Sequence, residues 1–115
     1  MQNDDPVFDY AEQRPYFLGG DAAMMQWLNE NIRYPVEAFQ QGIQGRVVVQ
    51  FIVERNGSIS NVQVVENARG VVNNPYLNAE AIRIVQAMPN WQPARHGGET
   101  VRVRFTLPMT FRLAD

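Results

Sequence analysis

The chain has 115 residues, enough for one domain with its own hydrophobic core and too few for two. It contains no cysteine, which excludes disulfides, thiolate metal sites and cysteine catalysis. All ten basic residues are arginine and four of the twelve acids lie in the first twelve residues, so the remainder carries ten positive and eight negative charges behind an acidic leader. A nucleic-acid-binding domain normally has a stronger basic patch, so we do not expect nucleic acid as a partner.

The first twenty residues lack a regular period and contain Pro6, Pro15 and a Gly19-Gly20 pair. They predict an extended leader over 1–20, in front of a domain over 21–115. Asp21 is a suitable N-cap for a helix over 22–30. Pro35 ends this helix, and a short turn over 36–39 is expected to follow.

The segment 46–54 alternates as a strand, with one face wholly apolar and the other mixed. Asn56-Gly57 is a strong hairpin signal, and the strand is expected to return over 58–66. In the returning strand Ile59 does not fall on the same alternation as Val62 and Val64, which predicts a bulge near Ser60-Asn61. The mixed face exposes Val48 and Ile52, which would allow homodimerisation.

A second helix is predicted after Pro75, with Leu77, Ala81, Ile82, Val85 and Met88 on one face. Trp91 lies between two prolines and is expected to pack on the core. The last strand then alternates from Val101 onward, and Pro108, which has no N–H, is expected to interrupt its ladder.

This order of elements predicts an α+β fold, with two helices on one face of a three-stranded antiparallel or mixed sheet. The strand order is 2-1-3, a split β-α-β arrangement with the C-terminal strand at the edge. An open edge can accept a partner's backbone as an added strand. The predicted binding residues are therefore those of the last strand: Val101, Arg102, Val103, Arg104, Phe105, Thr106 and Leu107. A proline at Val103 or Phe105 would abolish binding if that residue's N–H points outward.

Catalytic and metal sites have little support in the sequence. His96 is the single histidine and lies in a Gly-rich loop. No candidate nucleophile lies near a candidate base in the sequence. The side chains of Glu54 and Glu80 are expected to be exposed to solvent. We expect no cofactor, no metal and no enzymatic activity, although a carboxylate pair among Glu54, Glu66 and Glu99 stays open as an alternative.

The motifs from Tyr34 to Leu113 occur in an order that resembles the C-terminal domain of TonB-type energy transducers. They are Tyr34-Pro35, Ala38, Gly42, 45–51, Asn56-Gly57, 62–64, Ala81, 88–94 and 107–111. The leader from Gln13 to Gly20 and the following helix resemble the extension of Bacteroidetes-type members.

The resemblance implies a periplasmic domain, anchored to the inner membrane by a segment outside this chain. Such a domain carries force from the proton-driven ExbB/ExbD motor to outer-membrane TonB-dependent receptors. It captures the receptor's N-terminal "TonB box" by adding it to the last strand. In the best-known members a Gln-Pro pair before Tyr-Pro touches the receptor, but this chain has Asn31-Ile32 there, so that contact is not carried over.

An alternative interpretation comes from another class of protein. The same domain resembles the C-terminal module of membrane-bound sensor metallopeptidases, where it would sense a partner and transmit no force. The sequence upstream of Met1 would discriminate the two, because a transducer has one apolar span and a Pro-rich spacer there.

Overall fold

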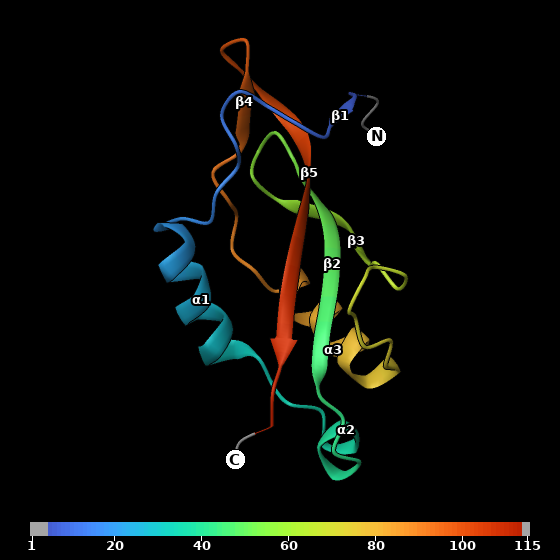
Figure 1. Ribbon diagram of the computed structural model, residues 1–115. Coiled ribbons are helices and arrows are strands. Elements are labelled where there is room, and N and C mark those ends of the chain that lie inside the picture. The colour runs from blue at the N-terminus through green and yellow to red at the C-terminus, as the bar shows by residue number, and fades with distance from the viewer. Residues whose placement is uncertain (1–4, 114–115) are drawn as a thin grey trace.

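The computed structural model describes residues 5–113 and has an α+β fold, as predicted. Its elements (Figure 1) are, in order, β1 (Val7–Phe8), α1 (Gly20–Asn31), α2 (Val36–Gln40), β2 (Gly45–Val53), β3 (Ile59–Val64), α3 (Pro75–Gln86), β4 (Ala94–His96) and β5 (Glu99–Phe111). The predicted three-stranded sheet with two helices is wrong in number, because the described residues form a five-stranded mixed sheet with three helices.

The sheet is built around β5. The strand order is β1-β5-β2-β3, with β4 paired to the start of β5, so the predicted 2-1-3 order survives as β3-β2-β5. β2 and β5 pair antiparallel without a break from Gly45 opposite Phe111 to Val53 opposite Val103. At about 3.3 Å per residue, β5 spans roughly 43 Å. It therefore extends over most of the length of the molecule, whose longest dimension is 48 Å.

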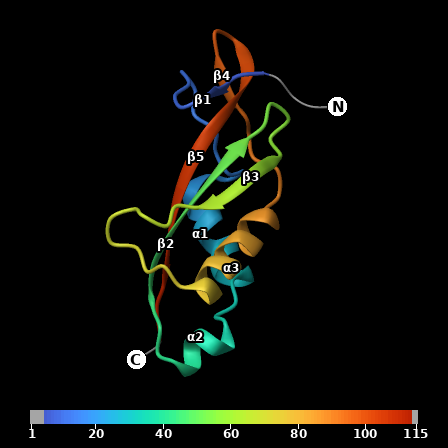
Figure 2. The same cartoon turned by 90° about the vertical axis from the view of Figure 1, so that its right-hand side faces the viewer.

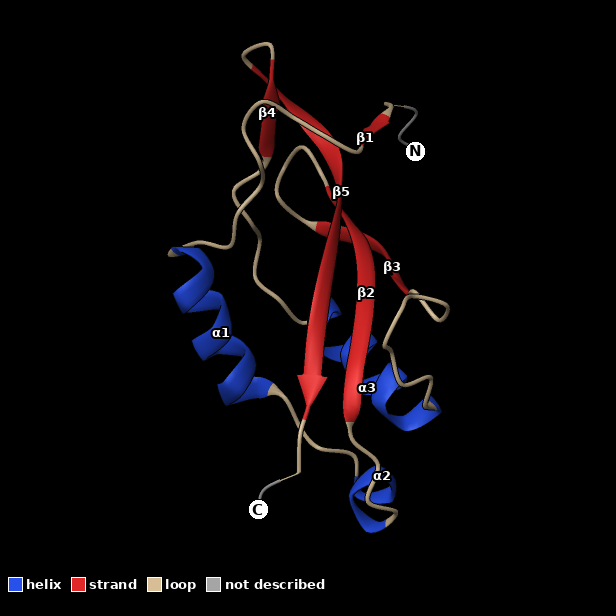
Figure 3. Ribbon diagram, in the orientation of Figure 1, coloured by secondary structure: helices blue, strands red, loops and turns tan. Residues whose placement is uncertain are grey.

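The C-terminal strand is not an open edge along its whole length, which corrects the prediction. β1 lies parallel to β5, with Val7 opposite Arg102 and Phe8 opposite Val103. β4 forms a hairpin with β5 through Gly97-Gly98, so that Ala94 lies opposite Val101. Both short strands are visible at the upper end of β5 (Figure 3).

Helices α1 and α3 lie on the same side of the sheet (Figure 2). Alternate residues of β2 and β5 point toward them, so that one apolar face of the sheet forms the core. This core contains Met24 and Leu28 of α1, Leu77, Ala81, Ile84 and Val85 of α3, Val47, Val49, Phe51 and Val53 of β2, and Val103, Leu107, Met109 and Phe111 of β5.

The opposite face of β2 is more buried than its sequence suggests. Val48 is 4% exposed and Ile52 is 5% exposed. The expectation that they form a half-exposed apolar surface is wrong, and the homodimer inferred from that surface loses its basis.

The helix boundaries differ from the prediction at two points. Gly19, with φ of 93°, is the N-cap of α1, so Asp21 lies in the first turn and does not cap the helix. Residues 36–40 form the helix α2 where a turn was expected, and Pro35 is its N-cap, whose C=O accepts from Phe39 N–H at 2.9 Å.

The β2–β3 connection confirms both the hairpin and the bulge. Ser58 C=O accepts from Glu54 N–H at 2.8 Å, which closes a three-residue loop in which Gly57 is left-handed, with φ of 87°. Opposite Phe51 the register shifts by one residue, and Asn61 takes φ of 50°. A bulge of this kind bends its strand, and β3 packs against α3.

Trp91 packs in the core as predicted and is 3% exposed. Its ring lies 4.9 Å from that of Phe105, 5.5 Å from that of Phe51 and 6.1 Å from that of Phe17. The indole thus joins the leader to the sheet.

Candidate functional site: the outer edge of β5

The structure divides the seven predicted binding residues into a covered and an open part. Arg102 and Val103 pair with β1 along the outer edge, whereas Val101 pairs with β4 in the hairpin. From Arg104 to Leu107 no strand of residues 5–113 other than β2 pairs with β5. The open edge continues beyond the predicted range to Phe111, the end of β5.

The direction of the backbone groups along this open edge follows from the register. Val48 C=O accepts from Val65 N–H on the β3 side, so the backbone groups of Val48 point away from β5. Pro108, its partner in β5, must then point its carbonyl away from β2, because opposite residues of an antiparallel pair alternate together. The backbone N–H and C=O groups of Thr106 and Thr110 also point away from β2, because every second residue of a strand directs these groups to the same side.

This geometry explains the proline in β5. Its missing N–H falls on the outer edge, where the β2 ladder does not need it, so the expected interruption of that ladder is wrong. By the same alternation Val103 and Phe105 point their N–H groups toward β2. Proline at either position would therefore break the internal ladder and would not test the outer edge.

A groove runs beside the open edge. It has a volume of about 370 Å³ and lies between β5, the leader and α1. Its lining includes Tyr16 of the leader, Met24 of α1, Trp91, and Phe105 to Pro108 of β5. The buried Nε1–H of Trp91 has no acceptor within residues 5–113. A strand added to β5 would thus border a partly apolar groove.

Arginines mark the junction between the covered and the open part of β5. Arg102 Nε lies 2.7 Å from Glu54 Oε1, and both side chains are largely buried, so the expectation that Glu54 is solvated is wrong. The hydrogen bond from Arg102 lowers the pKa of Glu54, burial opposes this, and a hydrogen bond from Ser60 adds to it. Arg104, more exposed, pairs with Asp9 of the leader. The guanidinium groups are therefore held in place by acids from two segments.

Glu80 is a second acid wrongly expected to be solvated, since it is 8% exposed on α3. Burial acts to raise its pKa, but hydrogen bonds from the Arg83 side chain and the Arg33 backbone outweigh burial and lower it. Arg33 N–H donates to Glu80 Oε2 at 2.7 Å, which fixes the connection between α1 and α2 onto α3. The role of Glu80 is to hold these helices together.

The residues weighed for catalysis or metal binding are spread apart or used elsewhere. Glu54 is paired with Arg102, whereas Glu66 and Glu99 are exposed. His96 Nδ1 accepts from Glu12 N–H at 3.2 Å. Within residues 5–113 no three His, Cys, Asp or Glu side chains gather where a metal ion could bind. No helix in that range is long and apolar enough to cross a membrane.

Sequence reasoning missed three parts of the site. The outward direction of Thr110 was not predicted, because the ladder was expected to be interrupted at Pro108. β1 and β4 escaped because two or three residues carry no measurable alternation. The Arg104–Asp9 pair had one signal, the acidic leader set against an arginine-bearing strand, but sequence alone gives no register between them.

Comparisons with known proteins identify the family. The model of the "Gram-negative bacterial TonB protein C-terminal" family matches residues 30–113. No curated protein matches the chain.

Solved structures share the fold. The solution NMR structure of the Pseudomonas aeruginosa TonB C-terminal domain has a TM-score of 0.60 and 22% identity, over 98% of both chains. A Helicobacter pylori TonB C-terminal domain has a TM-score of 0.58 and 22% identity, over 80% of this chain and 78% of its own. A shorter fragment of the H. pylori domain has a TM-score of 0.56 and 23% identity, over 82% and 94%. With the family model matching most of its length, this chain belongs to the Gram-negative bacterial TonB C-terminal domain family.

Proposed function

We propose that this chain is the periplasmic receptor-docking domain of a TonB-type energy transducer. It binds the TonB box of an outer-membrane transporter as an added strand on the open edge of β5. The observation that carries the proposal is the outward direction of the backbone groups at Thr106, Pro108 and Thr110, on a stretch of β5 that pairs only with β2 among the described residues.

Strand addition needs an extended peptide and an edge with regularly spaced donors and acceptors. Thr106 and Thr110 offer both an N–H and a C=O, whereas Pro108 offers only its C=O. Each main-chain hydrogen bond contributes about 0.5–1.5 kcal/mol net. Several such bonds, with side chains entering the groove beside Met24 and Trp91, support a specific but reversible complex.

The position of the edge also suits force transfer. β5 runs nearly the whole length of the molecule and is paired to β2 along nine of its residues. A peptide aligned with β5 and pulled along its axis loads its hydrogen bonds together. The force would come from the ExbB/ExbD motor in the inner membrane, through a segment outside this chain.

An NMR titration tests where the peptide binds. The ¹⁵N-labelled chain is titrated with an extended peptide from the N-terminus of a TonB-dependent receptor. We expect the largest amide shifts at Thr106, Leu107 and Thr110. Shifts centred on the Asn56-Gly57 hairpin would contradict the assignment of the edge.

The variant Thr106→Pro tests the hydrogen-bonding mechanism. It removes an outward N–H and leaves the β2 ladder intact, as Pro108 already does at an equivalent position. We expect peptide affinity to fall about tenfold, the loss of one hydrogen bond together with exclusion of the peptide by the ring. Thr106→Ala is the matched control, because it also loses the bond from Gln50 but keeps the N–H. Equal affinity of the two variants, measured by calorimetry, would reject strand addition at Thr106.

A further inference from the structure

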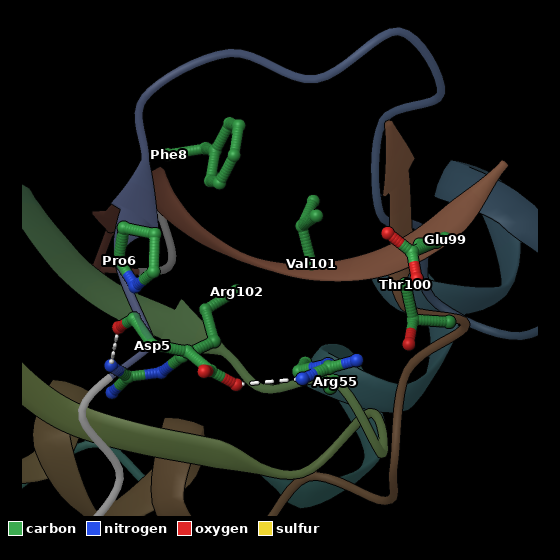
Figure 4. Close-up of a pocket in the computed structure, with 8 residues that line it drawn as sticks. All are labelled: Asp5, Pro6, Phe8, Arg55, Glu99, Thr100, Val101 and Arg102. Atoms are coloured by element: carbon green, nitrogen blue, oxygen red, sulfur yellow. Dashed lines mark hydrogen bonds and ion pairs between the residues drawn. The ribbon is translucent and has the colours of Figure 1, made fainter. Parts of the chain in front are cut away.

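The leader occupies part of the edge to which a receptor peptide would bind. Residues 5–9, which we call the arm, include β1 and lie along the first half of the predicted docking strand. Asp5 Oδ2 lies 2.7 Å from Arg55 Nη1, Asp5 C=O accepts from Arg102 Nη1 at 2.7 Å, and Asp9 pairs with Arg104 (Figure 4 shows the contacts of Asp5). The arm is therefore an added strand supplied by the chain itself.

The arm is attached more loosely than the leader residues that follow it. Val7 and Phe8 are half-buried and Asp5, Pro6, Asp9 and Tyr10 are exposed. A cavity of about 160 Å³ lies between the arm and the start of β5, with Phe8, Val101 and Arg102 in its lining (Figure 4). A second, of about 200 Å³, lies between Asp9-Tyr10 and residues 103–106. Of the arm residues, Phe8 packs against the core, with its ring centroid 5.3 Å from that of His96, so Phe8 provides the main apolar contact that is lost when the arm leaves.

The next part of the leader is firmly fixed. Gln13 exchanges two backbone hydrogen bonds with Arg95, and Tyr16 exchanges two with Gln92, all at 2.8–3.1 Å. Ala11 is 1% exposed and Phe17 is 6% exposed. The arm can thus detach at Tyr10 while residues 11–17 keep it tethered within reach of β5.

We propose that residues 5–9 are a tethered competitor of the receptor peptide, which must displace the arm to pair with β5 above Thr106. This inference rests on the proposed function. A tethered segment acts at an effective concentration in the millimolar range, so even weak contacts keep it bound. The two ion pairs of Asp5 and Asp9 are solvent-exposed and individually weak, which makes the arm displaceable.

Displacement leaves Arg55 and Arg104 without these two acidic contacts. An extended peptide that carries carboxylates at a spacing of four residues, as Asp5 and Asp9 do, would restore both. A neutral peptide would not. A peptide must therefore bind tightly enough to displace the arm. Acidic peptides are favoured, because they replace the contacts that Asp5 and Asp9 made with Arg55 and Arg104.

The test compares Asp5→Asn/Asp9→Asn with the unmodified chain. The matched control is Glu37→Gln/Glu66→Gln, which removes two exposed charges outside the arm. Calorimetry with a neutral extended receptor peptide gives the affinities, and NMR gives the shifted amides. We expect the arm variant to bind roughly threefold to tenfold more tightly, because the apparent affinity rises with the fraction of open edge. Its shifts should extend from Thr106 up to Arg102, and the control should match the unmodified chain.

The outcomes separate this inference from the proposed function. Equal affinities, with shifts confined to 106–110 in both proteins, would overturn the competitor and leave edge docking standing. Tighter binding in the control variant as well would also overturn it, since the gain would then come from net charge. If the peptide bound neither the unmodified chain nor the arm variant, the proposed function would be overturned, and so would the proposal that the arm competes with the peptide.

Discussion

At the scale of single residues, Gly57 joins the β2–β3 hairpin to the Trp91 turn. Trp91 N–H donates to Gly57 C=O at 2.8 Å, and a Cβ on Gly57 would lie 2.1 Å from the Trp91 carbonyl oxygen. The left-handed φ of 87° adds backbone strain for any other residue. We expect Gly57→Ala to lower the free energy of unfolding by about 2–4 kcal/mol, measured by urea denaturation.

The matched control is Gly70→Ala. Gly70 has a similar φ of 77°, but a Cβ there would meet no atom within 4 Å. It should cost about 1–2 kcal/mol from backbone strain alone. If the two variants were equally stable, the close approach to Trp91 would carry no energetic weight.

At the scale of elements, α3 depends on its N-cap. Asn74 Oδ1 accepts from Tyr76 N–H at 3.0 Å and from Leu77 N–H at 3.1 Å, which satisfies two donors that the first turn leaves open. We expect Asn74→Ala to reduce the free energy of unfolding by about 1 kcal/mol, measured by thermal or urea unfolding. Asn74→Ser should keep most of the free energy of unfolding that Asn74→Ala loses, because serine is also a good N-cap. If the serine variant were as destabilised as the alanine variant, another contact of Asn74 would be more important than the cap.

The elements that the sequence predicted are those whose stability is encoded locally. β2 and α3 repeat their apolar residues over 9 and 12 residues, and Gly57 marks the hairpin. β1, β4 and α2 are too short to show a period, and β1 forms only by pairing with the distant residues Arg102 and Val103. The outer edge of β5 was predictable from the alternation of that strand. Its partial coverage by residues 5–9 was not, because β1 has only two residues.

At the scale of the whole molecule, two acids connect separate parts of the fold. Glu54 of the hairpin binds Arg102 of β5, and Glu80 of α3 binds the backbone of Arg33 after α1. The pKa of each is lowered in the folded state from its ordinary value of 4.5. A lowered acid pKa stabilises the fold above the unfolded pKa, and this stability is lost as the pH falls through the folded pKa. We therefore expect stability from these groups to be constant at neutral pH and to decline below about pH 5.

Glu80→Gln separates the contribution of Glu80 from that of Glu54. Glutamine keeps the size and one acceptor oxygen but loses the charge, so the bonds from Arg33 and Arg83 weaken. We expect it to cost about 1–3 kcal/mol at pH 7, because hydrogen bonds to a charged group are the stronger kind. Urea denaturation from pH 7 to pH 3 should show a shallower acid decline in this variant than in the unmodified chain, with the exposed Glu66→Gln as control. An undiminished acid decline in Glu80→Gln would assign the pH dependence to other acids.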